Sequence, residues 1–275
     1  DMYIHAYKMD GLGNDFVIID NRLDPITLDQ NQIIKICDRK FIGCDQLILI
    51  NNHKSSDAHL KFFNSDGSES SACGNGTRCI AEFLSKENKK KNILLTTSSG
   101  ELNSDILGNN LVETGIGIGK TEWNEIPLSE NMNTKNLDIK IIDNKEIEHS
   151  GGIAVNVGNP HVVFFVNNVD NFDIKKIGPE VERHKFFPEK CNVTIAQIIN
   201  KNLIKVTVWE RGAGLTKACG TAACATAFAG LLNQFTSNEV DIKFKTGNLS
   251  IKIDQNNFIK MKGPVSNIEK LLIKL

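Results

Sequence analysis

The sequence predicts an α+β fold of two pseudo-symmetric lobes that arose by internal duplication. Each lobe is expected to be an antiparallel sheet wrapped around a central helix, with an active site in the cleft between the lobes. Many short strand-like runs and few helical segments favour the α+β class. A Cys-Gly pair that opens a helical run occurs twice, at Cys73-Gly74 and Cys219-Gly220. Polar residues upstream of the two pairs keep the same spacing, which indicates one unit used twice.

That spacing is the strongest sign of the duplication. Gly13-Asn14 and Gly158-Asn159 each precede a hydrophobic strand. Later residues keep their offsets within one position: Gln46 and Cys73 lie 32 and 59 residues after Asn14, and Asn192 and Cys219 lie 33 and 60 residues after Asn159. We therefore predict an N-terminal lobe of residues 1–119 plus 266–275, which carries Cys73, and a C-terminal lobe of residues 120–265, which carries Cys219.

In the first lobe, runs rich in β-branched and aromatic residues, bounded by Gly, Asn, Asp or Ser, predict strands. These runs cover residues 3–8, 16–19, 47–50, 58–63, 93–97, 101–107 and 111–118. A capping-box pattern at residues 27–30 predicts the start of a helix that carries Ile33 and Ile36. A second helix starts at the Cys73 motif and ends in the lysine-rich run 86–91.

The second lobe repeats this succession. A Gly-Asn-Pro-His turn at residues 158–161 separates its first two strands. Its strands are expected at residues 153–157, 162–166, 193–199, 203–209, 240–245, 249–253 and 258–261, and its helices at residues 174–184 and 220–232.

Composition excludes several classes of protein. A net charge of -1 gives no electrostatic case for a nucleic-acid or anionic-membrane partner, and no apolar run approaches a membrane span. Seven cysteines without a secretion signal favour a reducing, cytoplasmic location over a disulfide framework. Their spacing gives no zinc pattern, and the glycines form neither a dinucleotide nor a Walker motif. We therefore expect no metal and no cofactor.

The two Cys-Gly pairs suggest a chemistry. The free N–H groups of a first helical turn favour an anion, and a thiol at such a position is expected to have a lowered pKa. Two thiols facing one anionic substrate suit the reversal of a stereocentre. One thiolate removes a proton from one face of a carbon and the other thiol returns a proton to the opposite face.

The motifs resemble those of the diaminopimelate epimerase family over nearly the whole chain. They are the segments 11–17 (GLGNDFV), 44–47 (CDQL), 63–69 (FNSDGSE), 73–79 (CGNGTRC), 158–161 (GNPH), 210–214 (ERGAG) and 218–221 (ACGT). The resemblance implies a cofactor-independent epimerase that interconverts LL- and meso-diaminopimelate in the biosynthesis of lysine and of peptidoglycan precursors. It also implies a homodimer. The family usually has Glu where Leu215 stands and Gly where Ala222 stands.

The resemblance also implies roles for individual residues. Cys73 and Cys219 would be the catalytic acid/base thiols, with His161 and Glu210 tuning them. The substrate would be bound by the side chains of Asn14, Gln46, Asn64, Asn75, Asn159, Asn192, Glu210 and Arg211 and by the backbone of Gly74, Gly220 and Thr221. Physical chemistry agrees with these roles, because amide oxygens and Glu accept from ammonium groups and Arg grips a carboxylate through two hydrogen bonds.

Two alternatives stay open. A proline or hydroxyproline racemase of the same superfamily would keep both thiols but would not need an arginine for a distal carboxylate, so Glu210-Arg211 argues against it. A non-catalytic amino-acid-binding protein on the same scaffold would be expected to lose one thiol, and both are present. The C-x-x-C signature of a disulfide oxidoreductase is absent.

Overall fold

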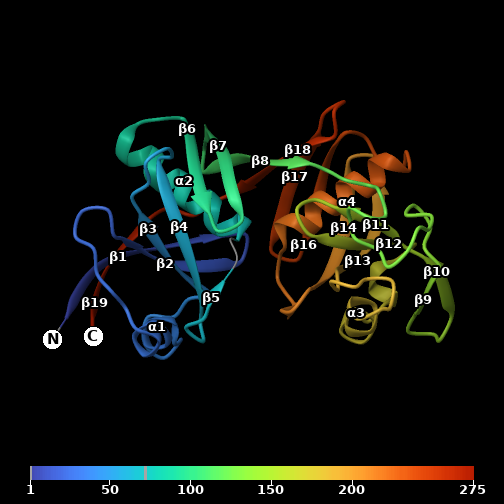
Figure 1. Ribbon diagram of the computed structural model, residues 1–275, viewed down its shortest axis with the longest axis horizontal. Helices are drawn as coiled ribbons and strands as arrows, with labels where there is room; N and C mark the ends of the chain where they lie inside the picture. Colours follow the sequence, from blue (N-terminus) through green and yellow to red (C-terminus); the bar gives the residue numbers. More distant parts are fainter. Residues whose placement is uncertain (1, 71–72) are drawn as a thin grey trace. The chain divides into compact units, whose positions relative to one another are not determined.

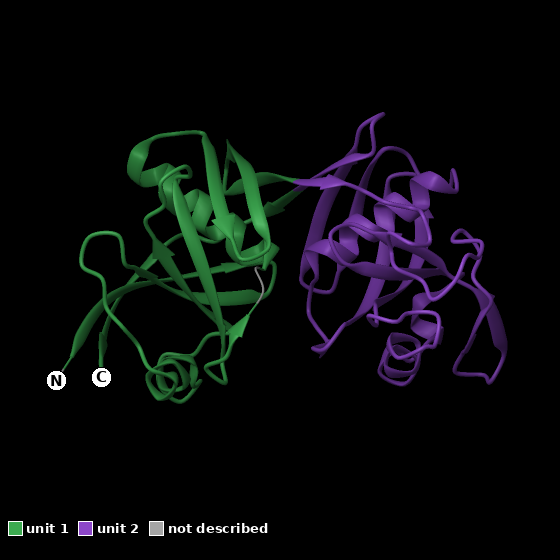
Figure 2. Cartoon of the chain, viewed as in Figure 1, with its two compact units in different colours: residues 1–115, 262–275 green, residues 116–261 purple. Residues whose placement is uncertain are grey.

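The computed structural model describes residues 2–70 and 73–275, so Ser71 and Ala72 of the predicted thiol motif lie outside the described residues. The chain forms two compact units (Figure 2): unit 1 comprises residues 1–115 and 262–275, and unit 2 comprises residues 116–261. The predicted lobe boundaries at 119/120 and 265/266 lie within four residues of these crossings. No helix in the described part of the chain is both long and apolar enough to cross a membrane.

Unit 1 contains a mixed sheet and two α-helices (Figure 1). Strand β1 pairs antiparallel with both β2 and β19, and β2 pairs parallel with β3. The sheet continues through antiparallel β4 and then β6 and β7 to β8. The elements are β1 (Tyr3–Gly11), β2 (Asn14–Asp20), α1 (Gln30–Cys37), β3 (Gln46–Asn51), β4 (Ala58–Asn64), β5 (Glu69–Ser70), α2 (Gly74–Asn88), β6 (Asn92–Thr97), β7 (Gly100–Gly108), β8 (Leu111–Ile118) and β19 (Glu269–Lys274).

Unit 2 has the same succession, preceded by a separate two-stranded sheet of β9 and β10. The chain enters unit 2 within β8 and leaves it within β18. The elements are β9 (Ile139–Ile142), β10 (Glu148–Gly151), β11 (Ile153–Asn156), β12 (Pro160–Phe165), the 3₁₀ helix η1 (Val169–Asn171), α3 (Ile174–Glu182), β13 (Asn192–Asn200), β14 (Leu203–Glu210), β15 (Gly214–Leu215), α4 (Gly220–Leu232), β16 (Glu239–Phe244), β17 (Gly247–Ile253) and β18 (Phe258–Pro264).

Strand pairing shows the duplication directly. In each unit the second and third strands are parallel neighbours joined through a helix: β2–α1–β3 in unit 1 and β12–α3–β13 in unit 2. A second parallel pair, β4–β6 or β14–β16, is joined through the helix that follows the cysteine. Parallel strands need such crossover connections. The predicted α+β fold with two duplicated lobes is confirmed, and each mostly antiparallel sheet includes two parallel pairs.

Each sheet packs around its second helix. In unit 1, α2 approaches the sheet closely at Gly76, where an added Cβ would lie 2.8 Å from Phe62 and 2.9 Å from Ile48. In unit 2, every residue of α4 from Ala222 to Gly230 is buried. A helix that is apolar on all sides belongs in a core. This central packing fixes the N-terminus of each helix, where the cysteine stands.

Candidate functional site

Cys73 is the N-cap of α2. Its backbone is extended, with φ -106° and ψ 127°, and its side chain is half-buried. Its carbonyl oxygen accepts hydrogen bonds from the Thr77 amide (2.9 Å) and the Thr77 hydroxyl (2.7 Å). The amides of Gly74 and Asn75 belong to the first turn, which has no acceptor within its own helix. The thiol therefore stands beside backbone donors that suit an anion.

Cys219 occupies the same position on α4. Its backbone is also extended, with φ -139° and ψ 115°. Its Sγ accepts from the Ala222 amide at 3.4 Å and lies 3.5 Å from the Thr221 hydroxyl. Gly220 and Thr221 open this helix as Gly74 and Asn75 open α2. The two cysteines are thus equivalent positions of the repeat, and all seven cysteines of the chain are thiols.

In each unit, the asparagine of the Gly-Asn turn reaches the start of the cysteine-bearing helix. In unit 1, Asn75 Nδ2 donates to Asn14 Oδ1 at 2.6 Å. In unit 2, Asn159 Nδ2 donates to the Thr221 hydroxyl at 3.3 Å. Asn75 and Thr221 each stand two residues after their cysteine. This contact explains why the spacing from asparagine to cysteine is kept in both halves.

Two residues that the motif analysis did not assign support this contact in unit 1. Arg78 is fully buried and its Nη2 donates to Asn75 Oδ1 at 2.5 Å. Asp45 Oδ2 accepts from Asn14 Nδ2 at 3.4 Å and from the Asp15 amide at 3.0 Å. The signal for Arg78 was its position three residues after Asn75 on a helix, where side chains are neighbours.

Gln46 and Asn64 face each other across β3 and β4, where they are paired in register. Gln46 Nε2 donates to Asn64 Oδ1 at 3.2 Å and to the Ser70 hydroxyl at 3.1 Å. In the equivalent place of unit 2, β13 begins at Asn192 and β14 ends at Glu210. The repeat therefore gives each unit a second polar pair where its third and fourth strands meet.

Asn192 joins two loops of unit 2. Its Nδ2 donates to the Pro160 carbonyl at 3.0 Å, and its Oδ1 accepts from the Arg211 amide at 2.8 Å. The Arg211 guanidinium is exposed and donates from Nη1 to the Glu189 carbonyl at 3.0 Å. The backbone of Arg211 is thus held while most of its guanidinium donors remain available to a ligand.

Burial raises the pKa of the Cys219 thiol well above its ordinary value, and the negative charge of Glu210 adds to the rise. Hydrogen bonds from Thr221 and the Ala222 amide act in the opposite direction but do not offset burial. The expectation of a lowered pKa is therefore wrong for Cys219. Its side chain is only 6% exposed, and removal from water costs the thiolate more than the helix N-terminus returns.

His161 is fully buried, and burial together with the positive charge of Arg211 lowers its pKa to about 3. The imidazole is therefore neutral at pH 7. Its Nε2 lies 2.8 Å from Asn159 Oδ1, an acceptor, which assigns the proton to Nε2. Its Nδ1 is buried without a hydrogen-bond partner. A neutral His161 orients Asn159, whose amide in turn contacts Thr221 beside Cys219.

This assignment predicts how stability depends on pH. The unfolded chain binds a proton at His161 below about pH 6.5, whereas the folded chain does not until about pH 3. The contribution of His161 to stability is therefore lost as pH falls, by about 2 kcal/mol between pH 7 and pH 5. Urea unfolding should show that His161→Asn removes this part of the slope. The same substitution at exposed His5 is the control, and equal slopes for wild type and His161→Asn would contradict the buried neutral state.

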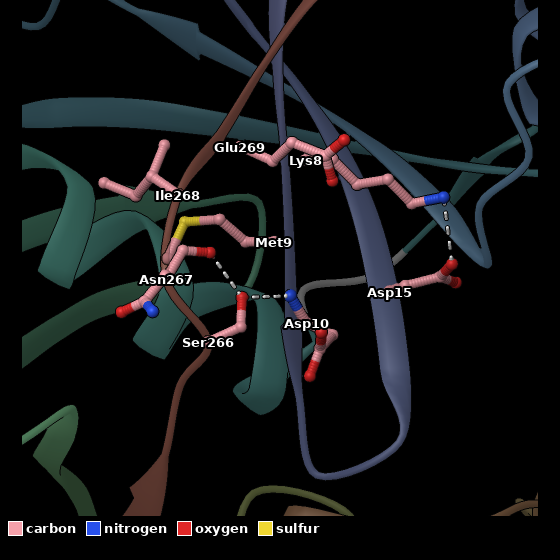
Figure 3. Close-up of a pocket in the computed structure, with 8 residues that line it drawn as sticks. All are labelled: Lys8, Met9, Asp10, Asp15, Ser266, Asn267, Ile268 and Glu269. Atoms are coloured by element: carbon pink, nitrogen blue, oxygen red, sulfur yellow. Dashed lines mark hydrogen bonds and ion pairs between the residues drawn. The ribbon is translucent and has the colours of Figure 1, made fainter.

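Two pockets lie away from the cysteines. One, of about 330 Å³, lies in unit 1 between β1 and the segment that leads into β19 (Figure 3). In its lining Ser266 Oγ accepts from the Asp10 amide at 2.9 Å. The other, of about 660 Å³, lies in unit 2 between β14 and β16. Neither is lined by a predicted site residue, and the described residues contain no cluster of His, Cys, Asp or Glu that could hold a metal ion.

The duplicated α+β units define a class of fold that known structures share. The chain matches a PhzF-family phenazine biosynthesis protein from Bacillus anthracis over the full length of both chains, with a TM-score of 0.69 and 13% identity. It also matches a hydroxyproline epimerase from Agrobacterium vitis, with a TM-score of 0.67 and 10% identity, covering 100% of this chain and 92% of that one. At such identity these likenesses show the fold alone.

Sequence comparison shows the family. The diaminopimelate epimerase family model matches residues 6–119 and 153–268. A diaminopimelate epimerase from Pelagibacter ubique (strain HTCC1062) is 64% identical over 274 residues, which cover 100% of both chains. One from Phenylobacterium zucineum (strain HLK1) is 41% identical over 94% of each chain. The chain belongs to the diaminopimelate epimerase family.

Proposed function

We propose that this chain is an isomerase that inverts one α-carbon of diaminopimelate and so interconverts the LL and meso forms. Family membership supports the activity and the substrate. The observation that carries the mechanism is the repeated helix start, where a cysteine N-cap is followed two residues later by a side chain bound to the Gly-Asn asparagine. Two matched thiols suit a reaction in which one stereocentre is approached from both faces.

In the proposed reaction, one cysteine as thiolate takes the α-proton and the other as thiol gives a proton to the opposite face. The electron pair of the broken C–H bond is delocalised into the neighbouring carboxylate and then forms the new C–H bond. The reverse direction exchanges the two roles, so each thiol must serve in both protonation states. The raised pKa of Cys219 supports a resting state in which it is the acid.

Stabilisation of the charge that grows on the carboxylate is assigned to backbone donors. Gly74 and Asn75 open one helix, and Gly220 and Thr221 open the other. Fixed donors cost little reorganisation in the transition state, and loss of one such donor in other enzymes costs about 3–4 kcal/mol. These amides are also polarised by their helix dipoles, which favour negative charge at the N-terminus.

Selectivity for diaminopimelate is assigned to the polar side chains around the helix starts. Arg211 keeps guanidinium donors for the distal carboxylate, and Glu210 can accept from an ammonium group. The remaining contacts are assigned to side-chain amides, whose two-sided donor and acceptor character suits an amino acid. These are Asn14, Gln46, Asn64, Asn75, Asn159 and Asn192.

Two wider features belong to the same proposal. The enzyme acts as a homodimer, which family resemblance implies, and it acts in the cytoplasm, where a reducing environment keeps seven thiols reduced. Its product serves lysine biosynthesis and the supply of peptidoglycan precursors.

The test is exchange of the α-proton with deuterated water, using purified reduced protein and either diaminopimelate or proline. We expect exchange and stereoisomer interconversion with diaminopimelate and none with proline or hydroxyproline. Exchange with proline alone would identify a racemase of the alternative kind. Binding of diaminopimelate without exchange would identify a non-catalytic binding protein, and either result would overturn the proposal.

A further inference from the structure

A buried carboxylate from α3 is hydrogen-bonded to both ends of the segment that carries Glu210 and Arg211. Glu182 is the last residue of α3 and is only 8% exposed. Its Oε1 accepts from the Trp209 indole Nε1 at 2.9 Å, and its Oε2 accepts from the Gly212 amide at 3.0 Å. Both carboxylate oxygens are therefore committed to donors on either side of the Glu210-Arg211 pair.

The turn between β14 and β15 has few other constraints. Gly212 and Gly214 both adopt positive φ, 75° and 82°, which a glycine tolerates and other residues rarely do. Two buried acceptors fix successive amides: Asn192 Oδ1 holds the Arg211 amide, and Glu182 Oε2 holds the Gly212 amide. The direction in which the Arg211 side chain leaves the backbone depends on both of these hydrogen bonds.

Trp209 makes this tie rigid. Its ring lies directly on α3 at Gly178, where an added Cβ would be 2.3 Å from Trp209 Cγ. The ring also covers Gly214, whose added Cβ would lie 3.4 Å from Trp209 Cη2. The indole N–H is thereby aimed at Glu182, and the aromatic ring packs the helix against the turn.

Unit 1 contains a related tie. The corresponding helix there is α1, and its Gln30 Nε2 donates to the Asp66 carbonyl in the turn between β4 and β5. That turn follows Asn64, and an added Cβ on Gly67 would lie 2.4 Å from Gln30 Cγ. In both units, therefore, the crossover helix binds the turn next to a proposed substrate-binding residue. Only in unit 2 does a charged group do so.

We propose that Glu182 is a positioning residue that holds the Glu210-Arg211 turn in its binding conformation. It touches neither reacting atom but fixes the backbone from which Arg211 reaches the distal carboxylate. The inference rests on the proposed function for its effect on substrate binding. Its effect on the turn itself can be measured independently of any activity.

Glu182→Gln is the informative substitution, since it keeps the size of the side chain. The amide has one oxygen and one NH₂ group, but both neighbours, Trp209 Nε1 and the Gly212 amide, are donors. In either orientation one donor faces another donor. We expect the KM for diaminopimelate to rise roughly tenfold while kcat falls less than threefold, the pattern of lost binding common to ground and transition states. Glu180→Gln, an exposed carboxylate on the same helix, is the matched control.

A double variant separates positioning from a general loss of stability. Trp209→Phe removes the indole donor, so in the Glu182→Gln/Trp209→Phe protein the amide oxygen introduced at position 182 is free to face the Gly212 amide. The added effect of Glu182→Gln on KM should then be less than about threefold. An equal effect in both backgrounds, or an unchanged KM in Glu182→Gln alone, would overturn the proposal.

Amide hydrogen exchange supplies the readout that needs no substrate. In Glu182→Gln the Gly212 amide should exchange at least about tenfold faster than in wild type, while amides of α4 keep their protection. Unchanged protection at Gly212 would overturn the tie even in an active enzyme. If the wild-type protein fails to act on diaminopimelate, the proposed function falls, and exchange at Gly212 still decides whether Glu182 holds the turn.

Discussion

Cys73→Ala and Cys219→Ala should each lower the interconversion of LL- and meso-diaminopimelate by roughly 10³-fold or more. A positioned general acid or base contributes about 10²–10⁴-fold, and this reaction needs both thiols in every turnover. The backbone donors at the helix starts remain in both variants, so binding of diaminopimelate should fall far less than turnover. The measurement is the initial rate of stereoisomer interconversion, with calorimetric binding of diaminopimelate to the same variants.

The chain offers a matched control in each helix. Cys79 lies inside α2 and Cys224 inside α4, and both are fully buried. Cys79→Ala and Cys224→Ala remove a thiol of the same helix from a packing position, so they should lower stability modestly and keep activity within a few-fold. Wild-type turnover in either catalytic variant, or equal losses in the control variants, would contradict the two-base assignment.

Exchange with deuterated water distinguishes the two thiols. If each cysteine serves one face, a variant that lacks one thiol can still remove the α-proton that faces the other. Cys73→Ala and Cys219→Ala should therefore differ in which stereoisomer they exchange, although neither interconverts the isomers. The same residual preference in both variants would mean that the cysteines do not act on opposite faces.

Arg211→Lys should weaken the binding of diaminopimelate by about 10–100-fold while leaving the free energy of unfolding nearly unchanged. Lysine keeps the charge but loses the fork that binds a carboxylate through two parallel hydrogen bonds. Hydrogen bonds to charged groups are worth about 1.5–3 kcal/mol, which corresponds to this loss of affinity. The Arg211 side chain is exposed, so little packing is lost. Calorimetry with diaminopimelate measures the change.

Arg183→Lys is the control for this change. Arg183 is the C-cap of α3, is exposed and lies in the same unit. Its substitution should leave the affinity unchanged. If Arg211→Lys binds diaminopimelate as tightly as wild type, recognition of the distal carboxylate belongs to another residue and the assigned role of Arg211 is wrong.

The local chain patterns predicted most of the architecture. Alternating runs of apolar residues placed the strands of both units, and the two Cys-Gly pairs placed the starts of α2 and α4. Equal spacing from Asn14 to Cys73 and from Asn159 to Cys219 predicted the duplication, which the strand pairing confirms. These features are readable because strand and helix periodicity are properties of neighbouring residues.

The mixed character of the sheets needed the tertiary structure. The sequence predicted antiparallel sheets, yet β2–β3 and β12–β13 are parallel in addition to the antiparallel pairs. Strand propensity does not specify which distant strand becomes a neighbour or in which direction it runs. The crossover through α1 or α3 decides that direction.

The electrostatics of the site also depended on packing. A helix N-terminus predicted a lowered pKa for Cys219, whereas burial and Glu210 raise it. Likewise, nothing near Glu182 in the sequence indicated that its carboxylate would hold the Gly212 amide, 30 residues away. The sequence by itself determined the two matched thiols, their helix starts and the repeat that relates them. Only the tertiary structure decided their protonation and the support of the Arg211 turn, because desolvation and long-range hydrogen bonds depend on how distant segments pack together.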